Sequence, residues 1–177
     1  VTATVDTTGT ITGRLAFEMD DAVDADKRQS ENKGYFYIKN GNFEISKIEE
    51  LWTRVSSTVD KTVGGIIITG GTFAVNPSAY VAEGYGADKN ANGTWTVVKA
   101  DGSEEQPYLI STGEQAYNMR NQKGYFKLVD DVVVTNEIYL SSKTVVIDLN
   151  GHSVRLEYAD GVKPNNGGVF NISGKKS

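Results

Sequence analysis

The amino-acid sequence predicts a mainly β protein with two short helices, arranged as an α+β N-terminal lobe over residues 1–99 and a parallel β-helix-like (solenoid) lobe over residues 100–177. Two observations favour this fold class. Short runs rich in Val, Ile, Tyr and Phe recur along the chain, separated by the Gly, Asn and Asp residues that favour turns. In the C-terminal part these runs follow one another so closely that they are typical of strands stacked in successive coils.

The composition narrows the classes of protein to be considered. Of 177 residues, 38% are hydrophobic and 23% charged, which is enough apolar content for one sizeable core or two small ones. The net charge is −5 and the basic residues are scattered, so nucleic-acid binding is not expected. No apolar run approaches the roughly 20 residues of a membrane-spanning helix, so membrane insertion is not expected either. The absence of cysteine excludes disulfides and thiolate metal sites.

The N-terminal lobe is expected to contain an alternating strand, a hairpin and a helix. Val1, Ala3 and Val5 alternate with polar residues, as in a half-buried strand. Asn40–Gly41 lies between two strand-like runs and is a preferred dipeptide of the type I′ turn, which predicts an antiparallel hairpin. A helix is predicted over Ser46–Ser57, because a capping box opens it and apolar residues then recur at helical spacing. The capping residues are Ser46 and Glu49, and the apolar residues are Ile48, Leu51, Trp52 and Val55.

The boundary between the two lobes is predicted at the turn-rich stretch Lys99–Pro107. Two overlapping capping boxes, Ser111 with Glu114 and Thr112 with Gln115, predict a second helix that ends near Asn121. Its modest apolar content is typical of a lid and not of a core helix. The short strands expected after it are Tyr125–Leu128, Val132–Thr135, Ile138–Leu140, Thr144–Leu149, His152–Leu156 and Val169–Ile172.

Two short sequence segments each occur twice in the chain. KGYF occurs at Lys33–Phe36 and at Lys123–Phe126, and each copy is followed by KTV, at Lys61–Val63 and at Lys143–Val145. One explanation is an internal duplication. The other is that both copies are amphipathic strands that use common β-forming residues.

The sequence also resembles segments of known bacterial proteins. Gly70–Phe73, Pro77–Tyr85 and Asn90–Val97 follow the pattern GGTF, PSxYVAxGY and NxxGTWTV, found in secreted and surface-displayed bacterial repeat proteins next to right-handed parallel β-helix domains. Pro107–Ser173, which includes VVIDLNGHSV, is similar to the opening of such a pectin-lyase-like domain. The resemblance implies an extracellular or cell-surface location, with a phage particle as the alternative. A solenoid needs about three coils or more to bury its ends, so we expect more chain after Ser177 or a covering subunit.

Aromatic residues are the candidates for ligand binding. Tyr80, Tyr85 and Trp95 lie in the loop-rich connection near the end of the N-terminal lobe, where a rigid planar side chain can stack on a sugar ring or a protein partner. The alternative is that these rings hold the irregular loop against the sheet.

Motifs for catalysis or metal binding are sparse. His152 is the only histidine, and its place beside the Asn150–Gly151 turn favours a structural role over a Ser-His-Asp triad. The acidic loop Asp20–Asp26 offers oxygen ligands for Ca²⁺, but its spacing differs from the EF-hand order, and a solvated loop is favoured. No cofactor is therefore expected, apart from calcium at this loop as the alternative. Asp130, Asp131 and Asp148 resemble the acidic residues of polysaccharide lyases, for which no cationic partner is evident.

These observations predict a non-catalytic structural or adhesive module of an extracellular bacterial surface protein or assembly, such as a filament or a virion. Its expected partners are further copies of itself or other surface-protein subunits, joined through the strand that holds Val1, Ala3 and Val5. Two alternatives remain. One is a fragment of a β-helix polysaccharide-degrading enzyme, and the other is a carbohydrate-binding module with a glycan partner.

Overall fold

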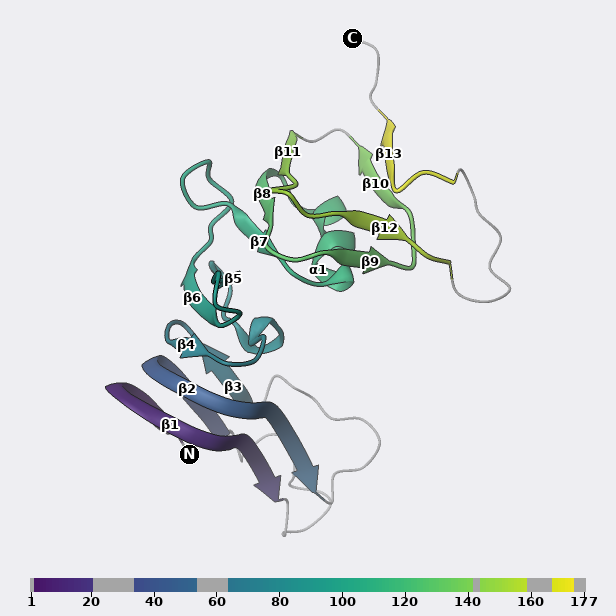
Figure 1. Ribbon diagram of the computed structural model, residues 1–177. Helices are drawn as coiled ribbons and strands as arrows, with labels where there is room; N and C mark the ends of the chain where they lie inside the picture. Colours follow the sequence, from purple (N-terminus) through teal and green to yellow (C-terminus); the bar gives the residue numbers. More distant parts are fainter. Residues whose placement is uncertain (1, 21–33, 54–63, 142–143, 159–166, 174–177) are drawn as a thin grey trace. The chain divides into compact units, whose positions relative to one another are not determined.

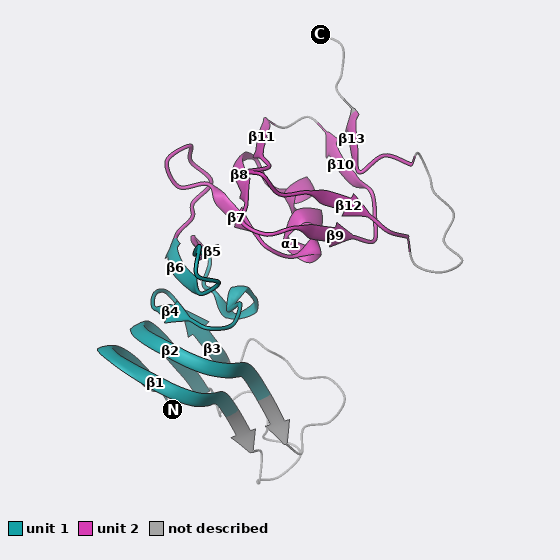
Figure 2. Cartoon of the chain, in the orientation of Figure 1, with its two compact units in different colours: residues 1–83, 89–98 teal, residues 84–88, 99–177 magenta. Residues whose placement is uncertain are grey.

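The computed structural model describes residues 2–20, 34–53, 64–141, 144–158 and 167–173, and the following account is of these residues (Figure 1). The chain divides into two compact units, shown in Figure 2: residues 1–83 with 89–98, and residues 84–88 with 99–177. Both units consist mainly of β-strands, which confirms the prediction of a mainly β protein. No helix of the described part is long and apolar enough to cross a membrane.

The first unit is a sheet of mainly parallel strands. Its strands are β1 (Thr2–Asp20), β2 (Gly34–Thr53), β3 (Gly64–Ile68), β4 (Thr72–Phe73) and β6 (Trp95–Lys99), with the 3-10 turn η2 (Ser78–Tyr80). β5 (Tyr85–Lys89) precedes β6 in the chain. β2 is the central strand, since it pairs in parallel with β1 on one side and with β3 and β4 on the other. β6 pairs with β4 in the antiparallel sense.

The register of this sheet places similar apolar side chains next to each other. Ile38 of β2 lies opposite Ile68 of β3, and Phe43 lies opposite Phe73 of β4; all four side chains are fully buried. The two phenylalanine rings stack with centroids 4.6 Å apart and an angle of 5° between their planes. Trp95 of β6 lies opposite Phe73 and extends the same row. A shift by one residue would move each of these side chains to the other face, so the buried row fixes the pairing.

The predicted hairpin at Asn40–Gly41 is wrong. β2 continues through this dipeptide, and both of its halves pair with β1 and with the β3–β4 segment in parallel. Gly41 still uses its conformational freedom, with φ at +143°, and its N–H donates to the Asn40 side chain at 2.9 Å. The dipeptide therefore bends a continuous strand. Stacking Ile38 and Phe43 on the next strands buries more apolar surface than folding them back on themselves.

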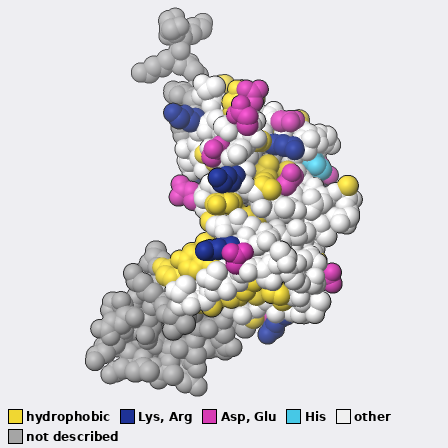
Figure 3. All heavy atoms as spheres, turned by 90° about the vertical axis from the view of Figure 1, so that its left-hand side faces the viewer, with side chains coloured by type: hydrophobic (Ala, Val, Ile, Leu, Met, Phe, Trp, Pro, Cys, Tyr) yellow, Lys and Arg dark blue, Asp and Glu magenta, His cyan; other side chains and the backbone are white. Residues whose placement is uncertain are grey.

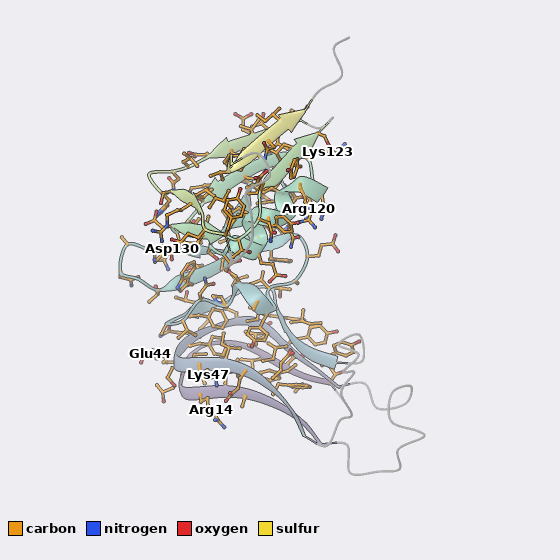
Figure 4. The ribbon with its side chains drawn as sticks, turned by 90° about the vertical axis from the view of Figure 1, so that its right-hand side faces the viewer. Arg14, Glu44, Lys47, Arg120, Lys123 and Asp130 are labelled. Atoms are coloured by element: carbon orange, nitrogen blue, oxygen red, sulfur yellow. The ribbon has the colours of Figure 1, made fainter. Side chains whose placement is uncertain are left out.

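The predicted helix over Ser46–Ser57 is also wrong for the part that the structure describes. Residues 46–53 belong to β2, and residues 54–57 lie outside the described residues. The two capping-box side chains bond to the neighbouring strand instead. Ser46 donates to the Gly13 carbonyl at 3.3 Å, and the Glu49 carboxylate pairs with Arg14 at 2.9 Å. Figure 4 shows Arg14 beside Lys47, which pairs with Glu49 at 2.6 Å.

The second unit consists of short parallel strands around one core. Its strands are β7 (Tyr108–Ile110), β8 (Gly124–Leu128), β9 (Val132–Val134), β10 (Ile138–Ser141), β11 (Val145–Asp148), β12 (Val154–Leu156) and β13 (Phe170–Ser173). β8 pairs with β7 and β11, β9 with β12, and β10 with β13. These strands overlap the six predicted ones. The Asn150 side chain donates to the Leu128 carbonyl at 3.0 Å. This bond joins the turn after β11 to the end of β8.

One helix is present in the described part of the chain: α1 (Gly113–Asn118), followed by the 3-10 turn η3 (Met119–Asn121). The capping box of Thr112 and Gln115 forms as predicted, with the Gln115 N–H donating to the Thr112 hydroxyl at 3.2 Å. The expectation of a lid is wrong. Ala116 and Met119 are fully buried in the same core as Phe126 and Leu128, so the helix is part of the core.

Candidate functional site

The first candidate site is the outer edge of β1. This strand pairs with β2 on one side, and no other described strand pairs with its second side (Figure 1). Ala3 is exposed and Val5 is half-buried, whereas Val1 lies outside the described residues. Ile11 and Leu15 are also half-buried, although their partners on β2, Phe43 and Ile48, are no more than 9% exposed. The apolar side chains of β1 are therefore covered on one side only.

A second set of strand edges lies in the other unit. β11, β12 and β13 each pair on one side, with β8, β9 and β10, and no described strand pairs with their other edges. Three apolar side chains of this region are well exposed: Val146 at 43%, Leu149 at 46% and Ile172 at 82%. On the face shown in Figure 3, exposed hydrophobic side chains lie between charged ones. These strands have the same one-sided pairing as β1.

The predicted aromatic residues have different surroundings. Trp95 is 5% exposed and packs in the core, with the Lys89 ammonium 5.4 Å from its ring centroid. Tyr80 is half-buried and donates its hydroxyl proton to the Ile48 carbonyl at 3.2 Å. Tyr85 is half-buried at the start of β5. A ligand site made by these three residues stays a prediction. Because Trp95 is buried, it would offer a ligand little ring surface.

The only histidine of the sequence lies beside Asp131 and Ser153. His152 Nδ1 is 3.9 Å from the Asp131 carboxylate, and the Ser153 hydroxyl donates to the same carboxylate oxygen at 2.9 Å. In a nucleophile–base pair the serine hydroxyl would instead bond to the imidazole. The Ser153 N–H also donates to Asp131, at 2.8 Å, so this group joins the turn before β12 to the start of β9.

The acidic residues form no metal site among the described residues, where no group of three or more His, Cys, Asp or Glu side chains is placed to hold an ion. Residues 21–26 of the predicted calcium loop Asp20–Asp26 lie outside that part of the chain. Asp148 accepts from the Asn150 N–H at 2.8 Å, and Asp130 accepts from the Asp131 N–H at 3.0 Å. Both carboxylates thus stabilise local turns.

The most connected polar group of the second unit is Glu137, which is only 5% exposed. Its Oε1 accepts from the Tyr158 hydroxyl at 2.6 Å and from the Gly167 N–H at 3.0 Å. Its Oε2 accepts from the Tyr139 hydroxyl at 2.9 Å and from the Asn171 side-chain amide at 2.8 Å. A buried carboxylate with four donors holds both ends of the connection between Tyr158 and Gly167 beside β10.

Sequence patterns alone did not identify Glu137, because three of its four donors are 21 to 34 residues away in the chain. The residue stands in a polar Asn-Glu pair between two strands, which is typical of a solvated turn. The only local signal is Tyr139, two residues later and therefore on the same face of β10.

Comparison with known proteins identifies no relative: no family model, no curated protein and no solved structure matches the chain.

Replacing Glu137 by Gln should lower the free energy of unfolding by about 2–4 kcal/mol. The amide NH₂ would face two of the four donors, and the remaining bonds would lose their ionic character. Glu157→Gln is the matched control, since Glu157 is exposed and pairs only with Arg155, at 3.1 Å. It should change the stability by less than about 1 kcal/mol. Denaturant unfolding measures both, and equal small effects would show that the Glu137 cluster contributes little.

The stability should also depend on Tyr158 in alkaline solution. The hydrogen bond to Glu137 raises the pKa of Tyr158 from 10.0 to about 12. Because the folded-state pKa is the higher one, this contribution is complete below about pH 10 and is lost as the pH rises to about 12. The wild type should therefore lose stability over this range more steeply than Tyr158→Phe. Denaturant midpoints measured at intervals of pH test this, with Tyr85→Phe as the control. Parallel curves for wild type and Tyr158→Phe would contradict it.

Proposed function

We propose that this chain is a non-catalytic structural or adhesive module of an extracellular bacterial surface protein or assembly, and that it acts by self-association of its strands. The observation that carries this proposal is the pair of one-sided parallel edges, β1 in the first unit and β11 to β13 in the second. β1 contains no proline, and Asp6 is its only charged residue before Arg14. A long strand edge with few charges favours the addition of another strand.

In this proposal the second unit is the start of a parallel β-helix. β8, β9 and β10 would form one coil, and β11, β12 and β13 the next, because each strand of the first set pairs in parallel with the corresponding strand of the second. α1 precedes the coils at the position of an N-terminal cap. The resemblance of Pro107–Ser173 to pectin-lyase-like domains supports the same arrangement.

Burial of apolar surface would drive the association. Within the first unit, Ile11 of the terminal strand β1 is half-buried, whereas its partner Phe43 on β2, which has a strand on each side, is fully buried. A strand from another copy, added beyond β1, would cover Val5, Ile11 and Leu15 in the same way. In the second unit it would cover Val146 and the exposed Ile172.

The two edges belong to different elements, so their contact would be head to tail. Such contacts form open filaments or arrays unless the geometry closes a ring. This is the behaviour expected of a surface assembly. The resemblance to secreted and surface-displayed repeat proteins supports an extracellular or cell-surface location, and a phage particle is the alternative.

An enzyme fragment that degrades polysaccharides is the competing proposal. A lyase needs an acid or base and a cationic group that stabilises the enolate, whereas Asp131 and Asp148 accept hydrogen bonds within turns. We expect no release of reducing ends when the protein is incubated with pectate or alginate. Turnover that is abolished by Asp148→Asn would establish the enzyme instead.

Self-association is tested by charging the two edges. Ala3→Lys and Ile172→Lys replace side chains that are exposed, Ile172 at 82%, so neither change disturbs the core. We expect the wild type to show a mass that rises with concentration, and each variant to be shifted toward the monomer by about tenfold or more in concentration. Light scattering after size exclusion and analytical ultracentrifugation measure this.

Val98→Lys is the matched control, because Val98 is 38% exposed and lies on β6, which is neither β1 nor one of the strands β11 to β13. It should associate as the wild type does. A wild type that stays monomeric at every concentration, or two edge variants that associate unchanged, would refute the proposal. Circular dichroism checks that each variant keeps its β-structure.

A further inference from the structure

A hollow of about 820 Å³ opens on the second unit, within the size range of small-molecule sites. Four segments form it: the turn that contains Asp101 and Ser103, the start of β7, the chain from the end of η3 into β8, and the start of β11. Two tyrosines line it, Tyr108 and Tyr125, and both are half-buried. The hollow includes residues of the repeated KGYF segment, but none of the sequence patterns predicted a binding site here.

Backbone hydrogen bonds hold the walls of the hollow together. The Gly102 N–H donates to the Gln106 carbonyl at 2.9 Å, which closes the turn. The Tyr125 N–H donates to the Gly102 carbonyl at 3.0 Å, which joins this turn to β8. The Gly124 N–H donates to the Thr144 carbonyl at 3.0 Å, which joins β8 to the chain before β11. The shape is therefore present before any ligand binds.

Tyr108 has a fixed position in this wall. Gly102 has φ at +83°, and a Cβ at this residue would overlap the Tyr108 ring, so only glycine lets the ring lie against the turn. On the other side the ring contacts Phe126, with centroids 5.2 Å apart and an angle of 40° between the planes. The Tyr108 ring therefore forms a rigid part of the wall of the hollow.

The polar groups of the hollow balance one another in charge. Hydrogen bonds from Ser103 hold the pKa of the Asp101 carboxyl below its usual value, so it is an acceptor at neutral pH. Lys123 contributes one ammonium and extends from the chain after η3 (Figure 4). Asn121 and Gln122 add two exposed amides that both donate and accept. One positive and one negative group favour neither a phosphate nor a polycation as the ligand.

We propose that this hollow binds a neutral oligosaccharide. The apolar C–H face of a pyranose ring would pack on Tyr125, and its hydroxyls would bond to Asn121, Gln122 and Asp101, since each hydroxyl both donates and accepts. The inference goes beyond the proposed self-association and does not depend on it, because the tyrosines and amides lie outside the edge residues tested there. With this inference, the module would adhere to glycans through the hollow and to other copies through its strand edges.

The test uses cellotriose, mannotriose and maltotriose as probes, with trigalacturonate as the acidic counterpart, in isothermal titration with the whole chain. At least one neutral probe should bind with Kd at or below about 1 mM. Tyr125→Ala should weaken that binding by about tenfold or more, and Gln122→Ala by about threefold or more. Because Gln122 is exposed, Gln122→Ala should keep the fold. It therefore tests the site even if Tyr125→Ala fails to fold.

Tyr37→Ala is the matched control, because Tyr37 is half-buried and lies on β2, outside the hollow. It should leave the affinity unchanged. No binding of any neutral probe up to about 10 mM, preferred binding of trigalacturonate, or affinity unchanged in both Tyr125→Ala and Gln122→Ala would overturn the inference. The mass of Tyr125→Ala measured as a function of concentration separates this result from self-association, which this variant should retain.

Discussion

The structure depends on in-register parallel pairing of strands that come from distant parts of the chain. In the first unit this pairing places Ile38 opposite Ile68 and Phe43 opposite Phe73, so that the core is a set of rows running across the strands. In the second unit it places Phe126 opposite Tyr108 and Ile147. Among the described residues, β1, β11, β12 and β13 each have a paired strand on one side only, and their apolar side chains are half-buried or exposed. These incompletely covered strands are the origin of the proposed association.

The two KGYF segments have the same structural role. In the first unit Gly34 begins a strand that pairs in parallel with Gly64, the residue after KTV, and in the second unit Gly124 pairs with Val145 inside KTV. The two repeated segments thus lie at neighbouring parallel strands in each unit, with a register that differs by one residue between the copies. An internal duplication stays a prediction, and two independent amphipathic strands remain the alternative.

The polar groups of the second unit join successive turns of the chain. Asp131 accepts from Ser153, Asn150 donates to Leu128, and Glu137 accepts from four donors that include Tyr158 and Asn171. Asp131, Glu137 and Asn150 thus stabilise the unit by bonding residues that are 21 to 34 positions apart in the chain. The hollow beside Tyr108 and Tyr125 differs from these turns, since its amide side chains, Asn121 and Gln122, are exposed to solvent.

The sequence by itself determined the features that depend on near neighbours in the chain. The capping box of Thr112 and Gln115, the strands from β8 to β13, and the corner at Asn150 were all predicted, because a turn or a cap is made by residues within a few positions of each other. Tertiary structure decided the rest. Ser46 and Glu49 have the spacing of a helix cap, yet they bond to Gly13 and Arg14. Pairing with a strand some thirty residues away buries Ile48 and outweighs the local helical pattern, and such long-range pairing leaves no mark in a short window of sequence.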